Sequence, residues 1–106
     1  MTPSLAVVGS INADLLIRTP RLPGRGESVM GGAPVWQPGG KGANQAIAAA
    51  RLGAAVSLYG AVGRDQPGEL CLTALRNARV ELSGVRSVAG PTGMAVVLVE
   101  EDTGEN

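Results

Sequence analysis

Short apolar runs, separated by glycine and proline, make up most of the chain. A run of apolar, strand-prone residues without alternation is typical of a strand that is buried on both faces. By this criterion the sequence predicts core strands at residues 5–9, 55–60 and 94–100, and shorter strands at 15–17 and 85–88.

Two other segments repeat their apolar residues at helical spacing and predict helices at 42–52 and 69–78. The first carries almost only alanine on its apolar face, which lets it lie close to a sheet, and it is followed by Gly53, where glycine commonly ends a helix. Residues 19–26 hold two prolines and two glycines and predict a loop, and 28–37 predict two short strands of an accessory sheet. The order of these elements predicts an α/β fold with a parallel sheet and an antiparallel flap.

Composition and charge narrow the function classes. The 106 residues carry nine basic and nine acidic side chains, a balance that gives no polybasic surface for nucleic acid. Histidine is absent, which excludes histidine acid–base catalysis and histidine metal ligands. The single cysteine permits no internal disulfide and suits a reducing compartment. With no secretion signal and no apolar run of roughly 20 residues, the sequence predicts a soluble cytoplasmic protein without membrane contact.

The densest chemical signal is the segment 39–44 (GGKGAN), where a loop enters the first predicted helix. Glycine lets a ligand approach the backbone, and a helix start offers unpaired N–H groups and a positive dipole end. The segment is not a P-loop, because Gly42 stands where that motif needs Ser or Thr; nor is it a dinucleotide fingerprint, because Gln45 replaces the third glycine. Lys41 and Asn44 instead fit a neutral ligand rich in hydroxyls. The alternative is a tight loop–helix junction that merely exposes Lys41.

A second constellation, Asn12-Ala13-Asp14, lies in a predicted polar turn just after the first core strand. Ligands of open α/β sheets bind beyond the carboxyl ends of the strands. In that position Asp14 can accept hydrogen bonds from two adjacent hydroxyls, with Asn12 donating and accepting beside it. The alternative is an ordinary turn in which both side chains bond their own backbone.

Three further features carry less weight. Cys71 lies between leucines of the second predicted helix and is expected to be a core residue rather than a nucleophile. Arg64 and Asp65 fit a salt bridge or a turn cap and are assigned no functional role. The acidic stretch 100–105 lacks the ordered spacing of a calcium loop and is expected to be a solvated turn that leads to a strand not present in the sequence.

The spacing of small residues resembles that of the ribokinase family of ATP-dependent sugar kinases, of the PfkB type. The amino-terminal signature of that family, a glycine pair, a nearby asparagine and spaced small residues, is met by Gly39, Gly40, Gly42, Asn44, Ala46, Gly53 and Gly63. The segments 9–14 (GSINAD), 26–27, 92–93 and 104–106 also fit, so the resemblance covers essentially the whole sequence.

This resemblance implies that residues 1–106 are the amino-terminal part of a ribokinase-like three-layer α/β sandwich. It implies a small β-sheet lid with strands at approximately 14–18, 28–38 and 93–100, which closes over a sugar and pairs with a second subunit in a homodimer. By the same resemblance, the sugar site contains Asn12, Asp14, Gly40, Lys41, Gly42 and Asn44.

For a full-length family member, the resemblance implies phosphoryl transfer from ATP, with magnesium and a monovalent cation such as potassium. The catalytic base and the ATP site belong to a glycine-rich stretch in the carboxyl-terminal half of the family, whose members are about three times as long. The 106-residue chain alone is therefore predicted to be inactive.

The segments GGKGAN and NAD most resemble the ribose-specific members of the family, which implies that D-ribose is converted to D-ribose 5-phosphate. Fructokinase and nucleoside kinase activities remain alternatives, because Pro34 and Pro38 change the predicted lid wall. A stand-alone, non-catalytic sugar-binding module is an alternative of a different class.

Overall fold

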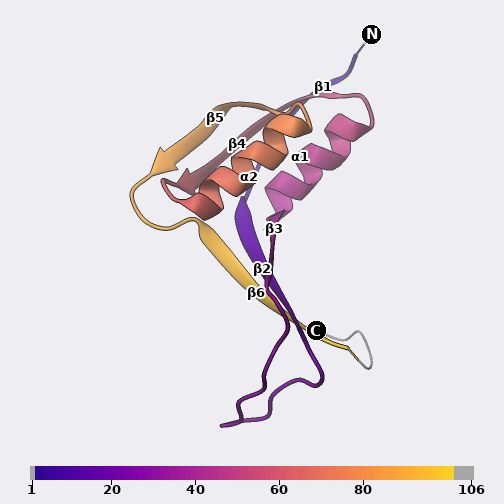
Figure 1. Ribbon diagram of the computed structural model, residues 1–106. Helices are drawn as coiled ribbons and strands as arrows, with labels where there is room; N and C mark the ends of the chain where they lie inside the picture. Colours follow the sequence, from indigo (N-terminus) through magenta and orange to yellow (C-terminus); the bar gives the residue numbers. More distant parts are fainter. Residues whose placement is uncertain (1, 102–106) are drawn as a thin grey trace.

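The computed structural model describes residues 2–101, which form six strands and two helices (Figure 1). In chain order these elements are β1 (Ser4–Val8), β2 (Asn12–Thr19), β3 (Val35–Gly39), α1 (Lys41–Arg51), β4 (Ala55–Gly63), α2 (Gln66–Asn77), β5 (Glu81–Val88) and β6 (Gly93–Glu100). Of the acidic turn predicted at 100–105, Glu100 ends β6 and Glu101 forms a turn. The remainder of that turn and the family match at 104–106 lie outside the described residues. Between residues 2 and 101, no helix is long and apolar enough to cross a bilayer.

A parallel sheet in the order β1-β4-β5 carries both helices on one face (Figure 1). Because alternate residues of a strand face opposite sides, Val56, Leu58 and Val62 of β4 turn toward the helices and are buried. The buried core between sheet and helices contains Ile11, Ala13, Ala43, Ala46, Val56, Leu58, Val62, Cys71, Leu75 and Val80. The predicted α/β class is confirmed.

Helix α1 packs closely on this sheet because the residues that face it are small. Gly42, Ala43 and Ala46 are its buried residues. A Cβ atom on Gly42 would lie only 2.5 Å from the carbonyl carbon of Gly9, just beyond the end of β1. This close approach, which the alanine-rich face predicted, brings the first turn of α1 against the end of β1.

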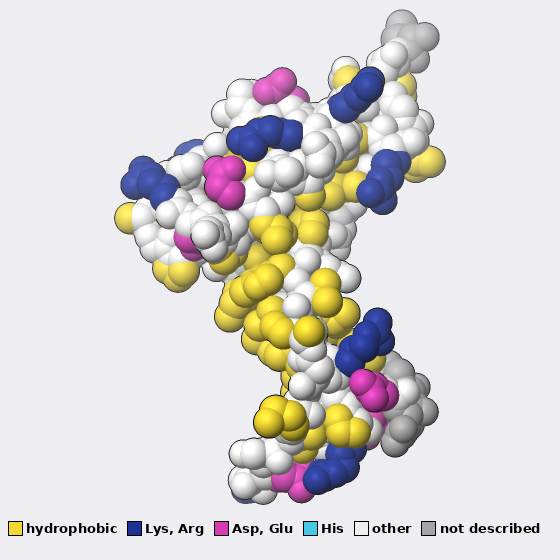
Figure 2. All heavy atoms as spheres, viewed as in Figure 1, with side chains coloured by type: hydrophobic (Ala, Val, Ile, Leu, Met, Phe, Trp, Pro, Cys, Tyr) yellow, Lys and Arg dark blue, Asp and Glu magenta, His cyan; other side chains and the backbone are white. Residues whose placement is uncertain are grey.

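A second sheet, in the order β3-β2-β6, projects away from the first and elongates the molecule to 53 × 32 × 19 Å (Figure 1 and Figure 2). Its central strand β2 runs antiparallel to β3 and parallel to β6. The predicted flap therefore exists as a mixed sheet rather than an antiparallel one.

The boundaries of several elements differ from the prediction. Asn12 and Asp14 lie inside β2 rather than in a turn, because pairing with β6 begins at Asn12. Residues 28–34, expected to belong to a lid strand, form no strand; Pro34 lacks an N–H to donate, and Gly32 N bonds Arg18 O (2.9 Å) without continuing a ladder. Strand β4 ends later than predicted. Helix α2 and strand β5 both begin earlier than predicted.

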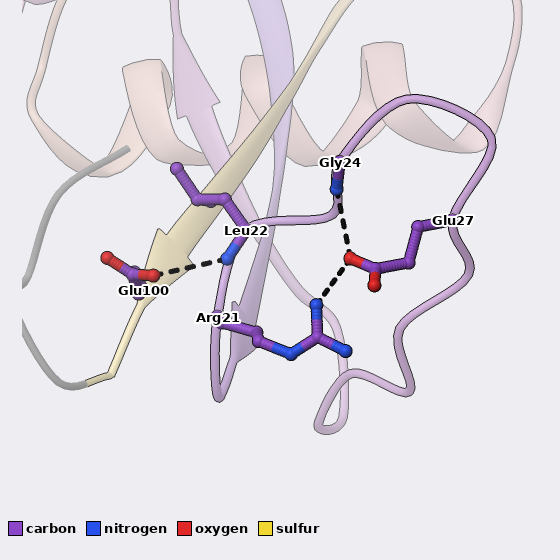
Figure 3. Close-up of polar contacts among 5 residues, drawn as sticks. All are labelled: Arg21, Leu22, Gly24, Glu27 and Glu100. Carbon is purple, nitrogen blue, oxygen red and sulfur yellow. Dashed lines mark hydrogen bonds and ion pairs between the residues drawn. The ribbon is translucent and has the colours of Figure 1, made fainter.

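The long connection between β2 and β3 is held by polar contacts of its own (Figure 3). The Arg21 guanidinium pairs with the Glu27 carboxylate, which also accepts a hydrogen bond from Gly24 N (3.0 Å). The bond from Arg21 and then the bond from Gly24 lower the pKa of the Glu27 carboxyl. Leu22 N donates to Glu100 Oε1 (3.3 Å), which ties this loop to the end of β6.

Candidate functional site

The two sheets are connected by three chain crossings that meet at one junction. The first two, residues 9–11 between β1 and β2 and Gly40 between β3 and α1, are in contact, since a Cβ on Gly40 would lie 2.5 Å from Ser10 O. The third crossing, 89–92, leads into Gly93, which pairs with Asn12. Both segments that the sequence singled out, 12–14 and 39–44, therefore lie at this junction.

Ser10 fixes the start of helix α1 at the junction. Its hydroxyl accepts a hydrogen bond from Lys41 N (3.0 Å), and its carbonyl accepts one from Ala43 N (3.1 Å). The N-cap residue Gly40 has no side chain for this purpose, so the preceding strand crossing satisfies two donors of the first helical turn. Ser10 was not singled out from the sequence, although it lies within the GSINAD segment.

Asn12 and Asp14 lie two residues apart on β2 and therefore share one face of the second sheet. Both are half-buried. The Asp14 carboxylate lies over Gly39, where a Cβ would come within 2.3 Å of Oδ2, and the Asn12 carboxamide lies over Gly93, where a Cβ would come within 2.5 Å of Oδ1. Glycine at these two positions leaves the room that the polar side chains occupy.

The Asn12 and Asp14 side chains have no partner in the part of the chain that the structure describes. Among residues 2–101, the Asp14 carboxylate and the Asn12 carboxamide form no hydrogen bond to a neighbour, and the two residues are part of a regular strand. The alternative of a turn whose side chains bond their own backbone is therefore wrong. A half-buried carboxylate and carboxamide on one face, without protein partners, are suited to bind hydroxyl groups of a ligand.

The first turn of α1 supplies the other predicted site residues. Lys41 and Asn44 are exposed, whereas Gly40, with φ 96°, and Gly42 are packed against the crossing at residues 9–11. The two glycines let the two backbones meet. Lys41 and Asn44 are the side chains that this turn offers to a ligand.

Cys71 lies beneath the junction, fully buried on α2. Its Sγ lies 3.2 Å from Asn12 O, and burial raises the pKa of the thiol. A neutral, inaccessible thiol is a poor nucleophile, so the expectation of a core cysteine is confirmed. Its contact with the backbone of Asn12 helps to seat β2 on α2.

Asp65 is the residue whose importance the sequence did not reveal. It caps α2 by accepting a hydrogen bond from Gly68 N (2.9 Å), as one of the two predicted options allowed. It also accepts bonds from Thr92, in the third crossing, and these bonds lower the pKa of its carboxyl. The sequence signal for the cap was an aspartate three residues before Gly68 at a predicted helix start, but Thr92 is too distant in sequence to be recognised as a partner.

The junction is equipped for binding and orientation. Among the described residues, no group of three or more His, Cys, Asp or Glu side chains is placed to hold a metal ion. The side chains gathered here supply hydrogen-bond donors and acceptors, together with one negative and one positive charge. They belong to Asn12, Asp14, Lys41 and Asn44. Such a set is suited to hydrogen-bond a polyhydroxylated molecule.

Comparison with known proteins agrees with this geometry. Residues 2–106 match the model of the pfkB family of carbohydrate kinases, and the chain belongs to that family. It is therefore a member of a phosphotransferase family, as the resemblance implied.

Ribokinases are among the similar proteins. The chain is 44% identical to the ribokinase of Lactococcus lactis over 99 residues, which are 92% of this chain and 33% of that protein. It superimposes with a TM-score of 0.83 on Arabidopsis thaliana ribokinase complexed with ribose and ATP, at 43% identity over 96% of this chain and 34% of that one. For a ribokinase of Cryptococcus neoformans in complex with ADP, the TM-score is 0.86 at 36% identity, over 100% of this chain and 33% of that one. The chain thus spans about a third of the length of the relatives that it matches, and the predicted ribokinase-like fold is confirmed.

Proposed function

We propose that this chain supplies the sugar-orienting part and the lid of an ATP-dependent ribokinase. The whole enzyme transfers the γ-phosphoryl group of ATP to the primary hydroxyl of D-ribose and forms D-ribose 5-phosphate. The observation that carries the proposal is the pair Asn12 and Asp14, half-buried side chains without partners among the described residues, set over Gly93 and Gly39 respectively. The similar proteins described above are ribokinases, one of which is complexed with ribose and ATP.

In this proposal the Asp14 carboxylate accepts hydrogen bonds from two adjacent sugar hydroxyls, and the Asn12 carboxamide both donates and accepts. Lys41 and Asn44, on the first turn of α1, close the other side of the sugar. Gly40 and Gly42 bring that turn near enough to contact it. Holding the sugar in one orientation presents a single hydroxyl to the phosphoryl group, and such positioning is a major part of phosphoryl-transfer catalysis.

The second sheet acts as the lid. It carries Asn12 and Asp14 on β2, so that sugar binding and lid position are coupled. A closed lid excludes water, which would otherwise compete with the sugar for the phosphoryl group. We assign the lid to the sheet β3-β2-β6, whose strands overlap those expected at 14–18, 28–38 and 93–100.

The lid also offers a surface for a second subunit. Trp36, Leu15 and Val96 are directly opposite one another on the three strands, on the face away from Asn12 and Asp14. Trp36 is 40% exposed and Val96 is 55% exposed. Burial of this apolar row against its copy is favourable, which supports a homodimer formed through the lid.

ATP, magnesium and potassium belong to the proposed whole enzyme rather than to these residues. The segment 39–44 lacks the P-loop hydroxyl, and the acidic side chains of residues 2–101 do not cluster around a metal position. The catalytic base and the phosphate-binding backbone are assigned to the remaining two-thirds of a family member, and the cytoplasm is its proposed location.

The alternative, a stand-alone sugar-binding module, is disfavoured by the first sheet. On the face opposite the helices, Val8 and Tyr59 lie side by side in register and are 81% and 46% exposed. A module that worked alone would leave these apolar side chains in water, at a cost in free energy.

The test is the steady-state rate of ATP-dependent ribose phosphorylation by the protein at its natural length, compared with its Asp14→Asn variant. We expect ribose phosphorylation that falls by at least tenfold in kcat/KM in the variant, since a bond to a charged acceptor is worth about 1.5–3 kcal/mol. Glu69→Gln removes an exposed carboxylate outside the site and is expected to have no effect. Absence of ribose phosphorylation, or equal rates for all three proteins, would contradict the proposal, as would phosphorylation by residues 1–106 alone.

A further inference from the structure

The position of the lid sheet β3-β2-β6 on the α/β core is set where the three chain crossings meet, which we call the joint. Between residues 2 and 101 the two sheets share no strand pairing, so the three crossings, together with the packing of β2 and β3 on α2, govern how one sheet sits on the other. The first two crossings, at residues 9–11 and at Gly40, are held by close glycine contacts around Ser10. The third, at residues 89–92, is held by a compact polar network instead.

The network is centred on the Asp65 carboxylate and the Thr92 hydroxyl. Asp65 Oδ1 accepts hydrogen bonds from Thr92 Oγ1 (2.6 Å) and Gly68 N (2.9 Å), and Oδ2 accepts one from Thr92 N (2.9 Å). Thr92 Oγ1 in turn accepts a bond from Gly63 N (2.9 Å). Thr92 is buried, and every one of these groups is satisfied by another member of the network.

The network joins two elements of the core, β4 and α2, to the lid strand β6. Gly63 ends β4, Asp65 caps α2, and Thr92 immediately precedes β6. The parts are in close contact, since a Cβ on Gly63 would lie 2.3 Å from Gly90 O and one on Gly68 would lie 2.8 Å from Thr92 Oγ1. Such packing leaves the crossing little freedom to shift.

Gly93, the residue after Thr92, links this network to the proposed sugar site. Gly93 pairs with Asn12, and the Asn12 Oδ1 atom would be only 2.5 Å from a Cβ on Gly93. Where Gly93 sits therefore determines where β2 and the Asn12 carboxamide sit. Asp14 follows two residues along the same strand, paired with Ala95 of β6.

We propose that Asp65 and Thr92 are positioning residues that anchor the base of lid strand β6 to the core and thereby align Asn12 and Asp14 for the sugar. The proposal rests on the proposed function of the site. Neither residue touches the sugar in this arrangement. They act through Gly93, and their removal leaves the sugar-binding side chains present but misaligned.

Three variants of the protein at its natural length test this role. Thr92→Val removes the hydroxyl and keeps the shape, Thr92→Ser keeps the hydroxyl, and Thr73→Val makes the same change at an exposed position of α2 outside the network. We expect the KM for ribose to rise about tenfold in Thr92→Val, because misaligned Asn12 and Asp14 side chains weaken a hydrogen bond to the sugar. Thr92→Ser and Thr73→Val are expected to keep the wild-type KM.

Hydrogen exchange of the same variants separates a loosened joint from general destabilisation. We expect Thr92→Val to lose amide protection in 12–19 and 93–100, while 55–63 keeps its protection. An unchanged KM with a lowered melting temperature, equal effects of Thr92→Val and Thr92→Ser, or a uniform loss of protection would overturn the proposal. If the wild-type protein phosphorylates no ribose, the proposed function fails, and the exchange pattern alone then decides whether the joint exists.

Discussion

Replacement of Gly39 by alanine tests the placement of the Asp14 carboxylate without altering any polar group. The added Cβ would lie 2.3 Å from Asp14 Oδ2, 2.6 Å from Cγ and 2.8 Å from Oδ1. To restore ordinary van der Waals contact, the carboxylate must move by about 1 Å. Both oxygens are affected, so a rotation of the carboxylate about its own axis does not relieve the clash.

The expected effect follows from the bonds that this displacement breaks. A hydrogen bond between a neutral hydroxyl and a carboxylate is worth about 1.5–3 kcal/mol, so the loss of one such bond weakens ribose binding about 10- to 100-fold. The stability of the fold changes less, because alanine is favoured over glycine in a strand by roughly 0.5–1 kcal/mol, which offsets part of the clash.

Calorimetric titration of ribose into the protein at its natural length measures this difference directly. Gly24→Ala is the matched control, since the nearest atom to its added Cβ is Glu27 Oε1 at 3.9 Å. Unchanged ribose affinity in Gly39→Ala, with a crystal structure showing the Asp14 carboxylate displaced, would refute the role assigned to Asp14.

Further predictions concern the fold that supports the site. The pKa of the Asp65 carboxyl is lowered by its bonds from Thr92 and then from Gly68, so its contribution to stability is present above the ordinary carboxyl pKa of about 4 and is lost as the pH falls through the lowered pKa. Urea midpoints measured from about pH 5 to 2 should therefore fall more steeply for the wild type than for Asp65→Asn; equal slopes would contradict this. Leu58→Ala, in the fully buried core, should lower the free energy of unfolding by about 2–5 kcal/mol in denaturant titrations, whereas Leu52→Ala, at a 90% exposed position, should change it by less than about 0.5 kcal/mol. Ser10→Ala removes the acceptor for Lys41 N and should cost about 1 kcal/mol by the same measurement, and a neutral result would show that water caps α1 equally well.

Local signals in the sequence were sufficient for the layers of the core. The alanine face of α1 and the apolar runs of β1 and β4 predicted a helix lying close to a parallel sheet, which the contact between Gly42 and Gly9 confirms. Each of these features depends on residues that are neighbours along the chain or along one helix face. The glycine pair likewise marked the junction, because close backbone approach leaves few other residues possible at Gly40.

The features that the sequence did not predict depend on contacts between segments that are distant along the chain. Asn12 and Asp14 looked like a turn, because their strand is stabilised by pairing with β6, about 80 residues later. Residues 28–34 were predicted to contribute to the lid strands but remain outside the sheet, since glycines and Pro34 interrupt the ladder. The bond between Asp65 and Thr92 joins residues 27 positions apart, and no local pattern marks such a pair.

The central claim is that Asp14 binds the adjacent hydroxyls of ribose, and a cycle of substrate and side-chain changes tests it most directly. The values of kcat/KM are measured for ribose, 2-deoxyribose and 3-deoxyribose with the wild-type protein and with Asp14→Asn. If Asp14 binds these hydroxyls, the two changes made together lower kcat/KM by less than the product of the two separate decreases. Separate effects that simply multiply would show that Asp14 and the hydroxyls do not interact, and would contradict the account.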